Sequence, residues 1–144
     1  MLDNKIKVGI IDLGINNIQS IFNAYQAIGC KVKIINKKQN LSNYNIIVLP
    51  GVGSFKYGMS KIKSLKIQND ILKFLEKSPK NILLGICLGM QLFFEKSLEF
   101  GKSKGMGLIQ GKVLPFDPKI CKKVPHMNWN SIQVSKKDKV FKKF

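Results

Sequence analysis

Short apolar runs alternate along the chain with segments in which apolar residues recur every three to four positions. The runs have the length and the β-branched content of buried parallel strands, and they cover residues 7–12, 31–36, 45–49 and 81–86. The other segments have the 3.6-residue period of amphipathic helices, which we expect at 18–28, within 61–76 and from 88 to about 98. Asn16 or Asn17 is suited to capping the first helix, and Gly29 to ending it.

The order of these elements predicts an α/β fold. Alternating strands and helices form an open, mostly parallel, doubly wound sheet, and 144 residues suffice for one such domain, 1–144. After Gly101, closely spaced glycines and prolines divide the chain into short segments, which predicts short antiparallel strands added to the sheet after residue 105. Ligands of open α/β sheets bind at the carboxyl ends of the strands, so functional residues are expected there.

The run at 81–86 continues into Gly85-Ile86-Cys87-Leu88-Gly89, the thiol counterpart of the G-x-S-x-G nucleophile elbow. The sharp strand-to-helix turn of such an elbow lifts the nucleophile clear of the sheet, and the flanking glycines leave room for the turn. The helix N-terminus favours a thiolate and offers free N–H groups to a developing oxyanion. Cys87 is therefore the candidate nucleophile. Cys30 and Cys121 lack this setting, and the alternative of a small apolar filler residue fits both.

A second glycine-rich segment, Gly51-Val52-Gly53, also follows a predicted strand, so it and Cys87 can face one crevice at the same sheet edge. No Cys/His group has the spacing of a metal site, and the turn after the first strand has too few glycines for a dinucleotide site. We therefore expect neither a metal nor a cofactor.

The net charge of +17 would ordinarily suggest a nucleic-acid or acidic-membrane partner. Every basic residue is lysine, however, whereas proteins that read nucleic acids favour arginine. The lysines are spread along the chain, which favours a solvated surface over a nucleic-acid or membrane partner. No apolar run is long enough for a membrane span, and three cysteines without an export signal indicate a cytoplasmic setting.

Five sequence blocks, taken together, resemble a known family. They lie at 9–18, 49–55, 85–91, 105–109 and 124–130, in the family's order, and the similarity spans essentially the whole chain. They resemble the glutaminase subunits of imidazole glycerol phosphate synthase, which are class I (triad-type) glutamine amidotransferases. The elbow alone indicates class I amidotransferases in general, whereas the block Pro125-His126-Met127-Asn128-Trp129-Asn130 narrows the resemblance to this subunit.

The resemblance implies an activity and a role for several residues. Cys87 would attack the side-chain amide of glutamine, forming a glutamyl thioester and releasing ammonia. The Leu88 N–H and one N–H of the 51–53 loop would form the oxyanion hole, and Gln91 would help to hold the glutamine. A heterodimer with a barrel-shaped synthase subunit, which receives the ammonia, is also implied. The residues near its docking face would be Asn16, Asn17, His126, Met127 and Trp129.

The chain departs from the family pattern in two places. Asn128 stands where the family usually has glycine. The family's catalytic histidine and its orienting glutamate form a His-x-Glu arrangement near the C-terminus that has no counterpart here, so we expect the chain to be C-terminally truncated. His126 is the single histidine of the chain. It is not expected to be the base, because Met-Asn-Trp follows it and the matching family position is not the base.

These features predict a glutaminase subunit that supplies ammonia for imidazole glycerol phosphate in histidine biosynthesis, with little activity on its own. Two alternatives stay open: ammonia supply for a sugar amidotransferase in surface polysaccharide synthesis, and a non-catalytic module that docks a partner. An RNA-binding function is supported by the charge alone.

Overall fold

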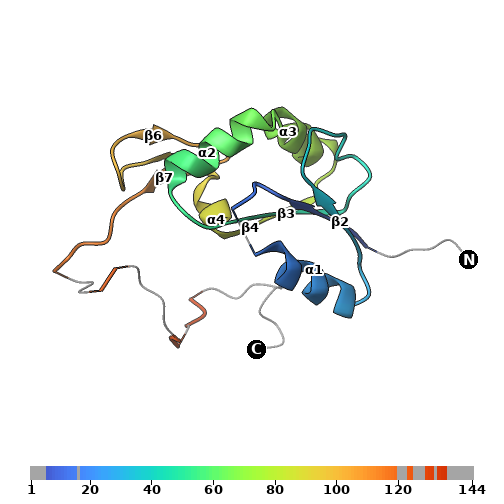
Figure 1. The fold of residues 1–144 in the computed structure, drawn as a ribbon, viewed down its shortest axis with the longest axis horizontal. Coiled ribbons are helices and arrows are strands. Elements are labelled where there is room, and N and C mark those ends of the chain that lie inside the picture. Colours follow the sequence, from blue (N-terminus) through green and yellow to red (C-terminus); the bar gives the residue numbers. More distant parts are fainter. Residues whose placement is uncertain (1–5, 16, 120–122, 125–128, 132, 136–144) are drawn as a thin grey trace, which may run out of the picture.

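The apolar runs of the sequence form a four-stranded parallel sheet (Figure 1). The strands are β1 (Lys7–Ile11), β2 (Lys31–Ile35), β3 (Ile46–Gly51) and β4 (Ile82–Cys87), in the order β2-β1-β3-β4. All three pairings are parallel, as the apolar runs predict. The computed structural model describes residues 6–15, 17–119, 123–124, 129–131 and 133–135.

Helices cover both faces of this sheet, which confirms the doubly wound α/β class. Helix α1 (Ile18–Ala27) lies on one face, and α2 (Phe55–Ser64) and α3 (Gln68–Lys77) lie on the other (Figure 1). The larger part of the core fills the space between the sheet and the α2–α3 pair, where Ile62 and Phe74 are almost completely buried. A smaller cluster lies on the α1 face. No helix of the described ranges is long and apolar enough to cross a membrane.

The single helix expected within 61–76 is wrong, because the structure has two helices there. The first begins earlier, at Phe55, where the Ser54 hydroxyl accepts a hydrogen bond from the Tyr57 N–H at 3.4 Å and caps the helix. The helix ends where Lys66 adopts a positive φ of 52°, which an α-helix cannot continue through. The fully buried Ile67 then starts α3.

The helix expected from 88 to about 98 is also wrong. Helix α4 (Leu88–Gln91) is a single turn, and a second sheet begins at β5 (Phe94–Ser97). The backbone after α4 pairs with a distant segment instead of continuing the helix: the Leu92 carbonyl accepts from the Met106 N–H at 2.9 Å, and the Phe93 carbonyl accepts from the Leu108 N–H at 2.8 Å. Tertiary hydrogen bonds have overridden the helical pattern.

The second sheet contains the short additional strands predicted near the end of the chain, with two differences. Its strands β6 (Ser103–Lys104) and β7 (Ile109–Val113) flank β5, in the order β6-β5-β7. The additions therefore begin at Phe94 instead of after residue 105. Only β6 pairs antiparallel with β5, whereas β7 returns parallel to it.

The glycines around Cys87 let α4 fold back tightly onto the parallel sheet. A Cβ atom on Gly89 would overlap the Leu49 carbonyl oxygen of β3, and one on Gly85 would overlap the backbone of Met90. The α4 turn thus contacts the main chain of both β3 and β4 without intervening side chains. This close packing fixes where the chain can turn after β4.

We expect Gly89→Ala to destabilise the protein by about 1–3 kcal/mol, as forced overpacking does, because the new methyl group meets backbone that cannot move aside. Urea denaturation followed by circular dichroism measures the effect. Gly58→Ala in α2 is the matched control. Its methyl group would lie 3.1 Å from the ends of the Leu88 and Leu92 side chains, which can shift. Equal losses in the two variants would contradict the close packing of α4.

Candidate active site

Cys87 occupies the turn between β4 and α4 with an unusual backbone conformation. Its φ is 54° and its ψ is −120°, and apart from Lys66 it is the only non-glycine residue of the described chain with positive φ. Strained backbone of this kind is typical of a nucleophile elbow, and it is retained only where the surroundings enforce it. The Cys87 side chain is exposed, so its thiol is accessible.

The 51–53 loop lies directly beside Cys87. In the pairing of β3 with β4, Gly51 is the register partner of Cys87. Gly51 is buried, and a Cβ atom placed on it would lie 3.2 Å from the Leu88 Cβ and 3.3 Å from the Gly89 nitrogen. The two segments that the sequence placed at strand ends therefore share one sheet edge.

The backbone N–H groups of Leu88 and Val52 differ in their hydrogen-bond partners. Leu88 is the first residue of α4, where a backbone N–H has no acceptor within the helix. The Val52 N–H, by contrast, donates to the Ile15 carbonyl at 2.9 Å, in the turn that precedes α1. Gln91 is the last residue of α4 and is half-buried, about one helical turn beyond Cys87.

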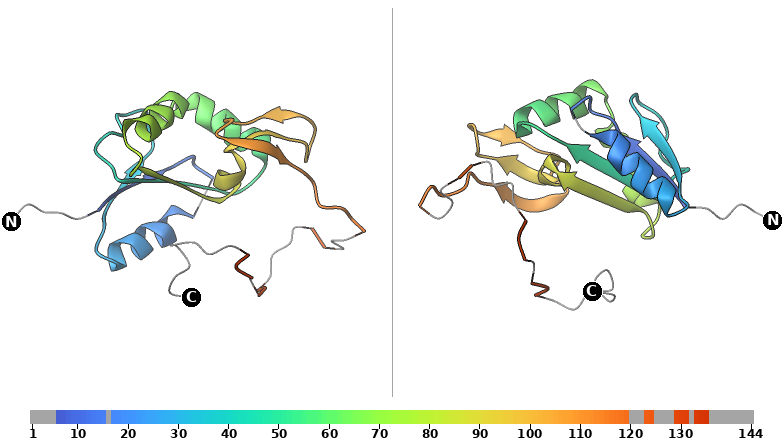
Figure 2. Two further views of the ribbon diagram at one scale, coloured as in Figure 1. Left: turned by 180° about the vertical axis from the view of Figure 1, so that it is seen from behind. Right: turned by 60° about the horizontal axis from the view of Figure 1, so that its bottom comes forward.

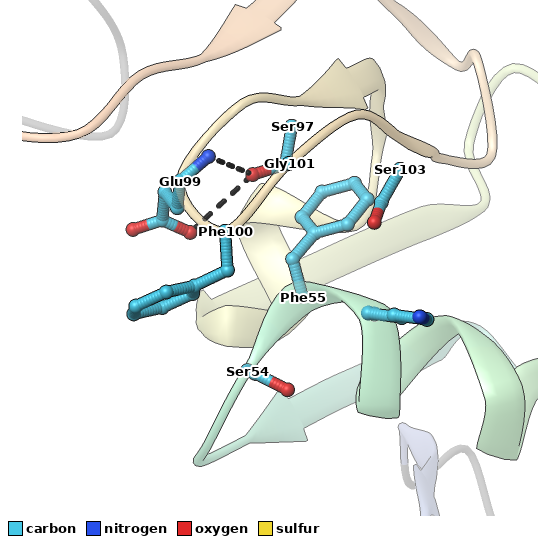
Figure 3. A pocket seen from close by; sticks show the side chains of 8 residues that line it. Ser54, Phe55, Ser97, Glu99, Phe100, Gly101 and Ser103 are labelled. Carbon is cyan, nitrogen blue, oxygen red and sulfur yellow. Dashed lines mark hydrogen bonds between the residues drawn. The ribbon is translucent and has the colours of Figure 1, made fainter.

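A cavity of about 320 Å³ opens between the start of α2 and the loop after β5 (Figure 3). Ser54, the residue that follows Gly53, lines it, whereas Cys87, Leu88 and Gln91 do not. Its walls combine aromatic, hydroxyl and charged side chains. The lining residues are Ser54, Phe55, Lys56, Ser97, Glu99, Phe100, Gly101 and Ser103.

Glu99 brings a carboxylate to this cavity. Its Oε2 accepts a hydrogen bond from the Ser97 hydroxyl at 3.4 Å, and its N–H donates to the same hydroxyl oxygen at 3.3 Å (Figure 3). Ser97 is 1% exposed, so the acidic side chain is tied to a fixed point of the fold. The sequence reasoning missed Glu99. The available signal was one acidic residue beside an aromatic one in a chain with 25 basic and 8 acidic residues.

The residues expected at a partner interface are only partly described. Asn17 is exposed. It lies two residues beyond Ile15, whose carbonyl accepts the hydrogen bond from the Val52 N–H, so it is close to the 51–53 loop. Trp129 is 99% exposed. Three further expected residues, Asn16, His126 and Met127, lie outside the described residues. Within the described ranges, no group of three or more His, Cys, Asp or Glu side chains is placed to hold a metal ion.

Comparison with known proteins identifies the family and the fold. Residues 9–144 match the family described as glutamine amidotransferase class-I. A solved structure described as the crystal structure of glutamine amidotransferase superposes with a TM-score of 0.62 at 19% identity, over 74% of this chain and 55% of that chain. At that identity the likeness shows the fold alone.

Curated relatives narrow the assignment. The chain is 38% identical to "Imidazole glycerol phosphate synthase subunit HisH" of Helicobacter hepaticus, over 98% of this chain and 69% of the relative. It is 41% identical to the HisH subunit of Wolinella succinogenes, over 94% of this chain and 66% of that protein. The chain thus spans about two thirds of the length of these relatives. It belongs to the glutamine amidotransferase class-I family and is a homologue of the HisH subunits of imidazole glycerol phosphate synthase.

Proposed function

We propose that the protein is the glutaminase subunit of an imidazole glycerol phosphate synthase and that Cys87 is its nucleophile. The observation that carries this proposal is the exposed, strained Cys87 at the end of β4, with Gly51 of the neighbouring strand beside it. A thiol in this setting fits acyl transfer from a carboxamide.

The proposed chemistry has two steps. The Cys87 thiol gives up its proton and attacks the amide carbon of glutamine, the amide nitrogen takes up a proton, and the C–N bond breaks, so that ammonia leaves and a glutamyl thioester forms. Water then hydrolyses the thioester to glutamate and frees the thiol. In both steps the Leu88 N–H would stabilise the oxyanion. A second donor from Val52 would require its N–H to leave the Ile15 carbonyl, whereas Gly53 provides another amide in the same loop.

The cavity between the start of α2 and the loop after β5 has groups that suit a free amino acid. The Glu99 carboxylate would pair with the α-ammonium group of glutamine, and Lys56 would attract its α-carboxylate. Gln91, on the other side of the nucleophile, would hold the substrate through its side-chain amide. In a chain of net charge +17, the Glu99 carboxylate in the cavity wall would bind a cationic group selectively.

The names of the relatives support a proposal for the partner and the setting. A protein named as a synthase subunit acts within an assembly, and we propose a barrel-shaped synthase subunit as the heterodimer partner that receives ammonia for histidine biosynthesis. Asn17 and Trp129 would lie near the docking face, with Asn16, His126 and Met127. We place the complex in the cytoplasm, because the cysteines Cys30 and Cys87 are free.

Two other functions keep specific support. A non-catalytic module that only docks a partner is favoured by the single histidine, His126, which is not followed by x-Glu. Ammonia supply to a sugar amidotransferase would use the same elbow and the same cavity, so the identity of the partner separates it from the proposed function.

A glutamine-analogue affinity label is expected to modify one residue, Cys87, because its thiol is exposed beside the oxyanion donors. Peptide mass spectrometry identifies the labelled site. Cys87→Ser should abolish labelling, and Cys30→Ser, which removes a half-buried thiol under α1, should leave it unchanged. Labelling at any other residue would contradict the assignment of the nucleophile.

Ammonia release from glutamine by this chain is expected at or near background, even with a synthase partner present. A positioned acid–base group contributes roughly 10²–10⁴-fold to such a reaction, and no His-x-Glu sequence is present to provide it. A coupled glutamate dehydrogenase assay measures the release. Turnover well above that of Cys87→Ser would show that another group acts as the base, and would rule out the non-catalytic alternative.

Glu99→Gln should weaken glutamine binding roughly tenfold to a hundredfold, as the loss of a charge-assisted contact of about 1.5–3 kcal/mol does. The rate of labelling by the glutamine analogue, measured against its concentration, gives the affinity. Glu76→Gln removes the same charge from the exposed surface of α3 and is the control. If both variants label like the unmodified protein, the α-ammonium group is bound elsewhere.

A further inference from the structure

Ser97 is the only polar side chain that is buried within the described part of the chain, with 1% of its surface exposed. It ends β5 and lies between the two other strands of the second sheet, as the register partner of Ser103 in β6 and of Val113 in β7. This sheet, yellow to orange in Figure 2, lies beside the green helix α2. A buried hydroxyl needs hydrogen-bond partners, because an unpaired one loses its hydration without compensation.

Glu99 supplies both partners of this hydroxyl. Its N–H donates to the Ser97 Oγ at 3.3 Å, and the Ser97 hydroxyl donates to the Glu99 Oε2 at 3.4 Å (Figure 3). A serine hydroxyl has one proton and two lone pairs, so the N–H occupies a lone pair and the proton is left for the carboxylate. A single buried oxygen atom therefore holds the backbone and the side chain of Glu99 together.

The turn after β5 restricts Glu99 further. The Leu98 N–H donates to the Val113 carbonyl at 2.9 Å, and Gly101 reverses the chain with a φ of 83°. Glu99 is half-buried, and its Oε1 has no hydrogen-bond partner among the described residues. One carboxylate oxygen is thus bound to the fold, and the other remains available to a ligand of the cavity.

We propose that Ser97 is a positioning residue, which holds the Glu99 carboxylate in the orientation that receives the α-ammonium group of glutamine. This inference rests on the proposed binding of glutamine by Glu99 and Lys56. Both contacts of the Ser97 hydroxyl are long for hydrogen bonds, so their main effect is on the orientation of the carboxylate and not on the stability of the fold. Without the hydroxyl, the Glu99 side chain would occupy several rotamers, and binding would have to select one of them at a cost in affinity.

The test is a double-mutant cycle, read from the concentration of glutamine analogue that gives half of the maximal rate of labelling at Cys87. Ser97→Ala should raise this concentration about threefold to tenfold, as the loss of one hydrogen bond does, and should leave the labelling rate at saturation unchanged. In the Glu99→Gln background the same substitution should change it by less than about twofold, because a residue that acts through the Glu99 carboxylate has no charge left to orient. Ser97→Thr keeps the hydroxyl and should label like the unmodified protein.

Val113→Ala is the matched control, because it reduces the packing beside Ser97 at a residue that does not line the cavity. It should lower the free energy of unfolding, measured by urea denaturation, and leave the half-maximal concentration unchanged. An equal effect of Val113→Ala and Ser97→Ala on labelling would overturn the proposal, because the hydroxyl would then act through stability alone. A folded Ser97→Thr variant that labels as poorly as Ser97→Ala would also overturn it.

The cycle separates this proposal from the proposed function. If Glu99→Gln weakens labelling but Ser97→Ala has no effect, or keeps its full effect in the Glu99→Gln background, the role of Ser97 is wrong and the binding of glutamine by Glu99 stands. If Glu99→Gln itself has no effect, the proposed binding of glutamine is wrong, and the role of Ser97 is wrong with it.

Discussion

The contact of the Gly89 backbone with the Leu49 carbonyl is the constraint on which the arrangement of Gly51, Cys87 and Leu88 depends. It places the α4 turn directly on β3, so the chain must turn sharply at the last residue of β4. That residue is Cys87, and its positive φ follows from the lack of room for a gentler turn. The same contact brings Leu88 over Gly51, so the strand end, the loop and the first helical amide form one unit. The backbone conformation of Cys87 is a consequence of this packing.

The second sheet forms one side of the cavity at the start of α2. Because the Leu92 and Phe93 carbonyls accept hydrogen bonds from the 105–109 segment, the chain leaves α4 as a strand and not as a longer helix. The loop after β5 consequently comes back over the start of α2 and brings Glu99 opposite Ser54. A continuous helix to residue 98 would have removed this wall. The short length of α4 is therefore what leaves room for this cavity.

Strands were easier to predict from the sequence than helix ends. The four parallel strands follow from apolar, β-branched runs, which are a local signal, and the G-x-C-x-G spacing marked Cys87 for the same reason. The break at Lys66 could not be predicted this way, because a positive φ at lysine does not change the pattern of apolar residues. The early end of α4 could not be predicted either, because it depends on hydrogen bonds to a segment about fifteen residues away. Glu99 was missed because a single acidic residue forms no sequence motif. Only the fold shows that it lines a cavity. Gly51 and Cys87 could be assigned to one edge, but their direct pairing needed the register.

The glycine packing around Cys87 also determines which substitutions the site can tolerate. A change at Cys87 alters the chemistry of an exposed side chain, and the fold has no need of the sulfur. A change at Gly85 or Gly89 disturbs the backbone on which α4 rests. A homologue could thus lose the thiol and still keep the elbow. The backbone shape of this turn is therefore a better indicator of family membership than of activity.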